Sequence, residues 1–334
     1  MLRAKQTLMI LGLTAACLLT ACSPSGQSEK AGTDNHGMKK VAITAIVEHP
    51  ALDAVRQGVI DELRAEGYEQ GKNLKLDFQS AQGNTATAGQ IAKKFAGSNP
   101  DAIVAIGTPS AQSMVAATRN IPMVFAAVTD PVAAKLVPSW EPSKTNVTGV
   151  SDELPLQPQI ALMKQVVPNL KTVGYVYSPG EVNSTVVLGQ LQSLLAKDGI
   201  NVAAAPAQRT TDVPMAAKSL QGKANLIYTS LDNNVVSAYE SMYKVAKDMK
   251  MPLVASDTGS VKRGAAVALG VNYHELGMAT GKIVGKILKG EKAGNIAPQR
   301  MSAEQLDLMV SKSHAAEQGI TLPPQLLKDA KIID

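Results

Sequence analysis

Polar side chains follow several short apolar runs of this sequence, at points where strands are expected to end. In "VAIGTPSAQSM", residues 104–114, the apolar run ends at Gly107, and Thr108, Pro109 and Ser110 follow. Proline fits the first turn of a helix, so a helix is expected to begin at this tip. The free N–H groups of that turn and the two hydroxyls would suit an anion such as a carboxylate. For this tip alone, helix capping by Thr108 without any ligand is the simpler interpretation.

Polar clusters at several other expected strand ends favour a shared ligand-binding role. Ligands of open α/β sheets bind at the carboxyl ends of the strands, so these clusters are expected to face a ligand. Capping explains hydroxyl groups more readily than the carboxylates beside them. The predicted ligand-binding residues are Glu48, His49, Thr108, Ser110, Thr129, Asp130, Ser178, Glu181, Asn183, Ser184, Asp232, Asn233 and Asp257.

A zwitterion such as an amino acid would satisfy both kinds of polar group. Its carboxylate would take the helix start at Thr108 and Ser110, with Thr129 as a further donor. Its ammonium would take a buried carboxylate, because an unpaired buried charge is very costly. The candidates, in order of preference, are Asp257, Asp130 and Asp232. Asp232 and its neighbour Asn233 could equally well cap the following helix.

Histidine and cysteine are too sparse for a metal centre, and neither a metal nor another cofactor is expected. Glu48 and His49 precede Pro50, so they are expected to shape the first tip. The other three histidines have no partners at metal-ligand spacing, and only Cys17 and Cys22 are present. A disulfide framework is therefore not expected either.

Aromatic residues make up only 3% of the chain, which disfavours nucleic-acid and sugar sites built on stacking. Tyr177, Tyr228, Phe125 and Tyr273 fall near strand ends or turns. They could line an apolar ligand pocket or belong to the core. Trp140, the single tryptophan, could line the rim of a cleft or pack on the surface.

Short apolar runs alternate with amphipathic helices from Lys40 onward, which predicts parallel sheets covered on both faces. A first series ends near residue 128, and residues 129–158 show no clear pattern. A second series then begins, and further strand–helix pairs follow after residue 264. The expected fold is α/β, with two Rossmann-like lobes and a central cleft. The predicted lobes comprise residues 40–150 plus 259–297 and residues 151–258 plus 298–334.

The N-terminus has the pattern of an export signal. Two basic residues precede an apolar run from Leu8 to Ala21, which is short for a membrane-spanning helix. Residues Leu19 to Cys22 resemble the bacterial lipoprotein box, which implies lipidation of Cys22 after removal of residues 1–21. Residues 22–39 would then be a lipidated, flexible tether. Without the signal, the net charge falls from +5 to about +3, so no nucleic-acid partner is expected.

Roughly residues 40–334 resemble the periplasmic substrate-binding proteins of ABC transporters, and more narrowly the tryptophan/tyrosine-type family. The motifs that carry the resemblance are "IVEHPALDAVRQGVIDEL", "AIVAIGTPSAQ", "IPMVFAAVTDPV", "GYVYSPGEVNS", "SDTGSVKRGAAVALGVNYHELGMATG" and "KSHAAEQGITLPPQLL". The resemblance implies the type I periplasmic-binding-protein fold, in which three crossovers join the lobes.

The resemblance also implies a function. A monomeric, lipid-anchored protein outside the cytoplasm would capture an amino acid, most plausibly an aromatic one. The lobes would close over it, and an ABC permease with its ATPase would receive it. A branched-chain amino acid or a small amide is the next candidate, and a sugar is less favoured.

Two alternatives remain open, a ligand-sensing lipoprotein that serves a receptor and an exported enzyme of unknown reaction. The sequence has no G-x-S-x-G, H-E-x-x-H or Walker motif, so no enzyme activity is expected.

Overall fold

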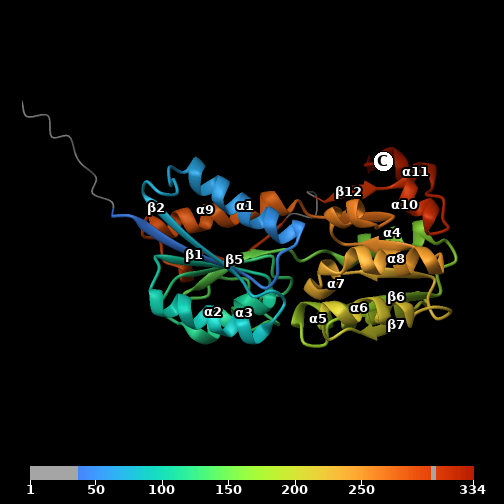
Figure 1. The fold of residues 1–334 in the computed structure, drawn as a ribbon, viewed down its shortest axis with the longest axis horizontal. Helices are drawn as coiled ribbons and strands as arrows, with labels where there is room; N and C mark the ends of the chain where they lie inside the picture. Colours follow the sequence, from blue (N-terminus) through green and yellow to red (C-terminus); the bar gives the residue numbers. More distant parts are fainter. Residues whose placement is uncertain (1–36, 302–305) are drawn as a thin grey trace, which may run out of the picture. The chain divides into compact units, whose positions relative to one another are not determined.

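The computed structural model describes residues 37–301 and 306–334, which form two β-sheets with helices on both faces (Figure 1). The first sheet has the strand order β11-β5-β4-β3-β1-β2, and its paired strands all run parallel. Its strands are β1 (Lys39–Ala45), β2 (Leu74–Ser80), β3 (Ala102–Ile106), β4 (Met123–Ala126), β5 (Val147–Ser151) and β11 (Gln299–Arg300). An α/β fold with two mostly parallel sheets is therefore confirmed.

Helices cover both faces of the first sheet. Figure 1 shows two helices on one face, α1 (Pro50–Ala65) and α9 (Tyr273–Leu288), and two on the other, α2 (Thr85–Ser98) and α3 (Thr108–Ala117). The short 3₁₀ helix η3 (Ala293–Asn295) precedes β11. Strand β3 is buried over its whole length, as expected for a parallel strand with helices on both sides.

The second sheet has the order β13-β12-β10-β9-β8-β6-β7. Strand β12 runs antiparallel to β10, which differs from the all-parallel sheet that the sequence predicts. The strands are β6 (Thr172–Tyr177), β7 (Asn201–Pro206), β8 (Leu226–Thr229), β9 (Leu253–Ala255), β10 (Val267–Gly270), β12 (Asp307–Val310) and β13 (Lys331–Ile332).

Two hydrophobic cores flank the second sheet because successive side chains point to opposite faces. Tyr175 and Tyr228 lie in one core, and Val176 and Ile227 in the other. The first core also contains residues of α4 (Leu156–Val166), α5 (Val182–Ala196), α10 (Lys312–Glu317) and α11 (Pro324–Asp329). The second contains residues of α6 (Val213–Lys218), α7 (Asn233–Ser237), α8 (Tyr239–Met249) and the 3₁₀ helix η2 (Thr258–Arg263). A further 3₁₀ turn, η1 (Thr210–Asp212), precedes α6.

Several element boundaries differ from the sequence-based expectation. Strand β5 lies within residues 129–158, where no regular pattern is apparent. Within the second series, residues 233–249 form two helices, α7 and α8, which are divided at Ala238.

Strand pairing also places some segments after residue 258 in the other lobe than the sequence predicts. The sequence predicts residues 259–297 in the first lobe, but η2 and β10 pack with the second sheet. Of that segment, only the elements α9 and η3 pack in the hydrophobic core of the first lobe. Strand β11 lies within 298–334 and pairs with β5 of the first sheet. The sequence of alternating strands and helices does not reveal this division, because β10 and α9 look like one continuous βα unit.

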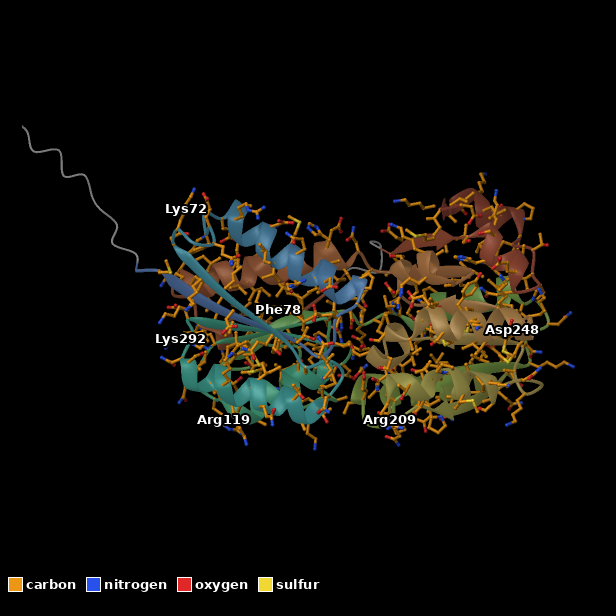
Figure 2. The ribbon with its side chains drawn as sticks, in the orientation of Figure 1. Lys72, Phe78, Arg119, Arg209, Asp248 and Lys292 are labelled. Atoms are coloured by element: carbon orange, nitrogen blue, oxygen red, sulfur yellow. The ribbon has the colours of Figure 1, made fainter. Side chains whose placement is uncertain are left out.

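The chain passes between the sheets after β5, after β10, and between β11 and β12. Charged side chains of both lobes point outward, among them Lys72, Arg119, Arg209 and Asp248 (Figure 2). Over residues 37–301 and 306–334, no helix combines the length and apolar character that crossing a membrane requires. The predicted signal, Cys22 and most of the predicted tether lie outside the described residues.

Helices α1 and α9 approach so closely that only glycine fits at their contact. A Cβ atom on Gly58 would lie 2.1 Å from the carbonyl oxygen of His274, and one on Gly277 would lie 2.2 Å from that of Val55. Both neighbours are backbone atoms, which cannot move without shifting a helix. This contact therefore fixes the start of α9, and with it Tyr273, against the first lobe.

Replacing Gly58 by alanine is therefore expected to lower the free energy of unfolding by about 2 kcal/mol or more, because the helices must separate. The matched control is Gly89→Ala in α2, where a Cβ would meet nothing within 4 Å. That change should be neutral or stabilising by up to about 1 kcal/mol. Urea unfolding of both variants measures the difference, and equal stability of the two would contradict the close packing.

Candidate ligand-binding cleft

The carboxyl ends of strands from both sheets meet around a small cavity. It holds about 10 Å³, roughly the space of one water molecule. Its polar wall comes from the ends of β1, β5, β8 and β9 and from the start of α9. The lining residues are His49, Ala51, Leu52, Ala127, Asp152, Leu231, Asp232, Asn233, Val236, Asp257 and Tyr273. We call this the inner cavity.

A second cavity, here called the side cavity, holds about 20 Å³ and shares Leu231 with the inner one. Hydroxyl groups of Thr129, Ser230 and Ser256 occur on its wall together with aliphatic side chains. The full lining is Thr129, Asp130, Glu153, Leu154, Leu156, Val186, Val187, Gln190, Ser230, Leu231 and Ser256. A ligand that extended from the inner into the side cavity would thus meet charged groups first and apolar surface beyond.

Asp152, directly after β5, is the least satisfied charged group of the inner cavity. Its side chain is buried, and Tyr273 donates a hydrogen bond from its hydroxyl to Oδ2 over 3.2 Å. Atom Oδ1 is buried and has no hydrogen-bond partner within the described residues. Burial raises the pKa of Asp152 to about 6, and the hydroxyls of Thr129 and Tyr273 offset part of that rise. The carboxylate would therefore gain from a cation that entered the cavity.

Asp257 is the second buried carboxylate of the inner cavity. It caps η2, accepting hydrogen bonds from the amide of Gly259 (3.0 Å) and the hydroxyl of Ser260 (2.6 Å). Burial nevertheless raises its pKa, although Arg263 opposes this weakly. Backbone and hydroxyl groups thus satisfy its lone pairs, but no salt bridge within residues 37–301 and 306–334 reaches its charge.

His49 does not supply that positive charge. It caps α1, and its Nδ1 accepts a hydrogen bond from the amide of Leu52 over 3.4 Å. Burial, together with the charge of Arg263, lowers the pKa of His49 to about 3, so the imidazole is neutral at physiological pH. Neither cavity is lined by lysine or arginine among the described residues. The same residues contain no group of three or more metal-ligating side chains that could hold an ion.

Asp232 caps a helix, which is one of the two roles that the sequence left open. It lines the inner cavity, and it also caps α7 by accepting a hydrogen bond from the amide of Val235 over 3.0 Å. The amide and the hydroxyl of Ser178 donate to its two oxygens over 2.6 and 2.8 Å. Ser178 therefore holds Asp232 in place through two hydrogen bonds, but it does not itself line either cavity.

Glu181 holds Asn233 in a similar way. Its Oε2 accepts hydrogen bonds from the amide and the side chain of Asn233 and from the side chain of Asn183. Burial and the charge of Asp232 raise the pKa of Glu181. Ser184 lies further back, where its carbonyl oxygen accepts a hydrogen bond from Tyr175. These residues support the tip of β8 from the neighbouring tip of β6.

Four predicted residues lie elsewhere or have another visible role. Glu48 is exposed and accepts a hydrogen bond from Gln82. Asp130 lines the side cavity, but one of its oxygens accepts hydrogen bonds from the amides of Val132 and Ala133. Thr108 and Ser110 are buried at the start of α3 and line neither cavity.

The start of α3 nevertheless has an unused donor. Gly107 occupies the cap position with φ 86°, and no side chain forms a capping hydrogen bond there. The hydroxyl of Ser110 is buried and has no partner within residues 37–301 and 306–334. Capping by Thr108, the simpler interpretation of this tip, is thus wrong.

The aromatic residues that the sequence suggests for a ligand pocket fall into two groups, those in the hydrophobic core and those at the cleft. Tyr228 and Phe125 are core residues, and Tyr177 stacks against Tyr175. Tyr273 lines the inner cavity. Trp140 lies beneath the guanidinium of Arg300, 3.4 Å from the ring centroid, and lines neither cavity.

The sequence reasoning missed Asp152, Ala127 and Leu231. Asp152 follows "NVTGVS", an alternation of β-branched and small residues that can indicate a strand. Ala127 adopts φ 52°, a left-handed conformation that is uncommon for alanine and often found at functional sites. No sequence pattern marks that conformation.

Asp232→Ala should lower the free energy of unfolding by about 3 kcal/mol or more, because three donors lose their buried acceptor. Asp130→Ala is the matched control, since it removes an acceptor for two amides at a half-buried position. Its cost should be about 1 kcal/mol. Chemical denaturation of the ligand-free variants measures both values, and a smaller loss for Asp232 than for Asp130 would contradict the assigned role.

Known proteins resemble this chain over nearly all of its described length. The tyrosine-binding protein of Clostridioides difficile (strain R20291) is 38% identical over 294 residues, which are 87% of this chain and 85% of that protein. An ABC domain from Streptococcus pneumonia, solved in complex with L-Trp, is 32% identical with a TM-score of 0.85 and covers 89% of this chain and 100% of its own.

A third comparison concerns conformation. The ligand-free, open structure of a substrate-binding protein with adhesive properties from Clostridium difficile is 37% identical, with a TM-score of 0.66. It covers 89% of this chain and 99% of its own. Although this relative is closer in sequence than the L-Trp complex, it superposes less well, so the conformation described here is nearer to that of the complex.

The family model described as "ABC transporter substrate binding protein" matches residues 40–333. The chain belongs to the family of ABC transporter substrate-binding proteins, whose members bind solutes outside the cytoplasm.

Proposed function

We propose that this protein binds a free amino acid, with an aromatic one as the expected ligand, in the inner and side cavities. It delivers the ligand to an ABC permease with its ATPase and acts as a monomer. The observation that carries the proposal is the pair of buried carboxylates, Asp152 and Asp257, in a cavity without a lining cation. An α-ammonium group would supply the missing positive charge.

Asp152 takes the place of Asp257 as the preferred partner for the ammonium group. Its Oδ1 has no hydrogen-bond partner within the described residues, whereas both oxygens of Asp257 accept hydrogen bonds. The ligand carboxylate would be held by neutral donors. Thr129, which the sequence predicts as a donor to the carboxylate, lines the side cavity.

An aromatic side chain is supported by two features. Leu154, Leu156, Val186 and Val187 give the side cavity an apolar wall. A relative of this chain is named a tyrosine-binding protein, and another was solved with L-Trp. Both relatives are more than 30% identical to this chain over most of its length.

The lobes are proposed to open and close around the ligand. The two cavities hold about 10 and 20 Å³, too little for an amino acid, so entry requires that their walls separate. Closure would then exclude water from the charged groups and strengthen their interactions. The better superposition on the L-Trp complex than on an open, ligand-free relative supports a closed arrangement.

Asp152→Asn tests the proposal. The variant should lose ligand binding, yet its ligand-free form should be more stable by about 1–3 kcal/mol, because it no longer buries a charge. A thermal-shift panel of the common amino acids measures both effects. Wild type should respond to one or a few of them. The exposed Asp101→Asn variant is the control and should behave as wild type.

The same interaction predicts a pH dependence. Burial raises the pKa of Asp152 to about 6. Below that pH the residue takes up a proton and becomes neutral, so its charge no longer attracts an ammonium group. Affinity of wild type should fall about tenfold between pH 7 and pH 5, since the ionised fraction falls by that factor. Retained affinity in Asp152→Asn, or a flat wild-type profile, would contradict the assignment.

Anchoring through lipid on Cys22 is a further part of the proposal, supported by the lipoprotein-box sequence from Leu19 to Cys22. Several acyl chains on one residue give stable membrane binding. The variant Cys22→Ser should therefore leave the detergent phase in a phase-partitioning experiment, whereas Cys17→Ser should partition as wild type. Unchanged partitioning of Cys22→Ser would rule out this anchor.

A further inference from the structure

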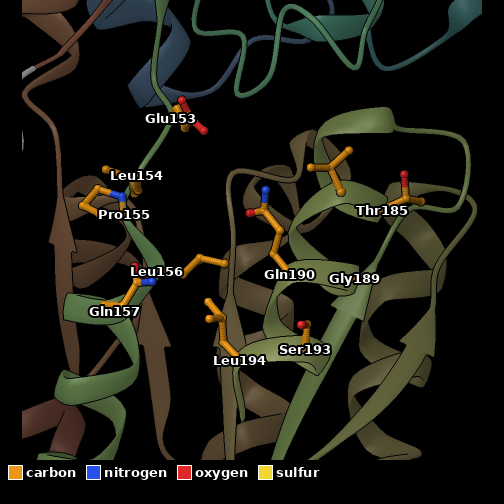
Figure 3. A pocket seen from close by; sticks show the side chains of 11 residues that line it. Glu153, Leu154, Pro155, Leu156, Gln157, Thr185, Gly189, Gln190, Ser193 and Leu194 are labelled. Carbon is orange, nitrogen blue, oxygen red and sulfur yellow. The ribbon is translucent and has the colours of Figure 1, made fainter. Parts of the chain in front are cut away.

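An open groove lies outside the side cavity, between the start of α4 and one face of α5 (Figure 3). It encloses about 620 Å³, within the range of small-molecule sites. Figure 3 shows Leu156 projecting from the start of α4 toward α5, which carries Gln190 and Leu194. The lining residues are Glu153, Leu154, Pro155, Leu156, Gln157, Thr185, Val186, Gly189, Gln190, Ser193 and Leu194.

The groove and the side cavity are separated by one wall, whose residues line both spaces. Glu153, Leu154, Leu156, Val186 and Gln190 line both of them. These five residues therefore separate the two spaces. Gln190 is exposed and unbranched, so it can change rotamer beside the half-buried Val186, whose β-branched side chain is held in one rotamer by the helix. A group that passed between them would connect the closed cleft with the outside.

The chemistry of the groove suits a neutral group, because Gln157, Thr185, Gln190 and Ser193 give it uncharged polar surface beside its apolar residues. Leu154, Pro155, Leu156, Val186 and Leu194 provide its apolar surface. Its charged side chain, Glu153, is held by Arg300, whose Nε lies 2.6 Å from Oε2. The ion pair leaves no unbalanced charge to select an ionic group.

We propose that this groove is an outer subsite for an extension of the ligand's side chain. The ligands it would admit are aromatic amino acids that carry a large uncharged substituent at the para position. This inference rests on the proposed function, with the amino-acid head group at Asp152 and the side chain directed through the side cavity. The apolar wall of the side cavity continues into the groove at Leu154, Leu156 and Val186, so the substituent would remain in apolar contact.

Gly189 provides a direct way to block the groove. It lies in α5 and lines the groove, and a Cβ at this position would meet nothing within 4 Å. The variant Gly189→Phe therefore fills the groove without strain in the fold. Gly97→Phe is the matched control, since Gly97 is an exposed helical glycine of α2 that also has no atom within 4 Å of a Cβ.

The experiment compares L-tyrosine, L-tryptophan and O-benzyl-L-tyrosine by isothermal titration calorimetry. Wild type and Gly97→Phe should bind O-benzyl-L-tyrosine with a Kd within about tenfold of that for the better of the two natural amino acids. Gly189→Phe should bind that natural amino acid unchanged and weaken O-benzyl-L-tyrosine at least tenfold.

Three further outcomes separate this inference from the function on which it rests. Wild-type binding of a natural amino acid without any binding of O-benzyl-L-tyrosine would overturn the outer subsite alone. Equal binding of the extended ligand by wild type and Gly189→Phe would also overturn it. If none of the three amino acids binds, the aromatic amino-acid function fails, and the subsite fails with it.

Discussion

The cleft depends on carboxylates that are buried where the described part of the chain provides no lining cation. Removing a charge from water costs several kcal/mol unless a partner compensates it. Asp152 and Asp257 bear this cost, and burial raises the pKa of both. Neutral His49 does not relieve it. A ligand that brings an ammonium group gains directly from this arrangement, because its binding offsets a cost that the empty protein already carries.

Much of the surrounding structure holds these groups in place. Asp232 is fixed by Ser178 and by the first turn of α7, and Glu181 in turn holds Asn233. Tyr273 reaches Asp152 from the start of α9, which packs on α1 through glycine contacts. Two lobes thereby contribute to one polar site, and separation of the lobes would divide it. A closed cleft with little internal space is consistent with such a cycle of opening and closing.

The sequence was sufficient for the fold class and for most strands, because continuous apolar runs such as residues 102–106 admit few other interpretations. It located the tips of β1, β4, β8 and β9 at the cleft. It missed Asp152 because β5 lies in a polar stretch without clear periodicity. It could not separate residues that line the cavities, such as Asp257, from residues that support them, such as Ser178. That distinction depends on long-range contacts between strand ends, as does the division of β10 and α9 between the sheets.

The most direct test of the central claim is a crystal structure of the protein with its bound amino acid, grown with L-tyrosine or L-tryptophan at saturating concentration. We expect the α-ammonium nitrogen within about 3 Å of Oδ1 of Asp152 and the side chain in the side cavity. An ammonium group placed away from Asp152 and Asp257, with both carboxylates still unpaired, would contradict the account.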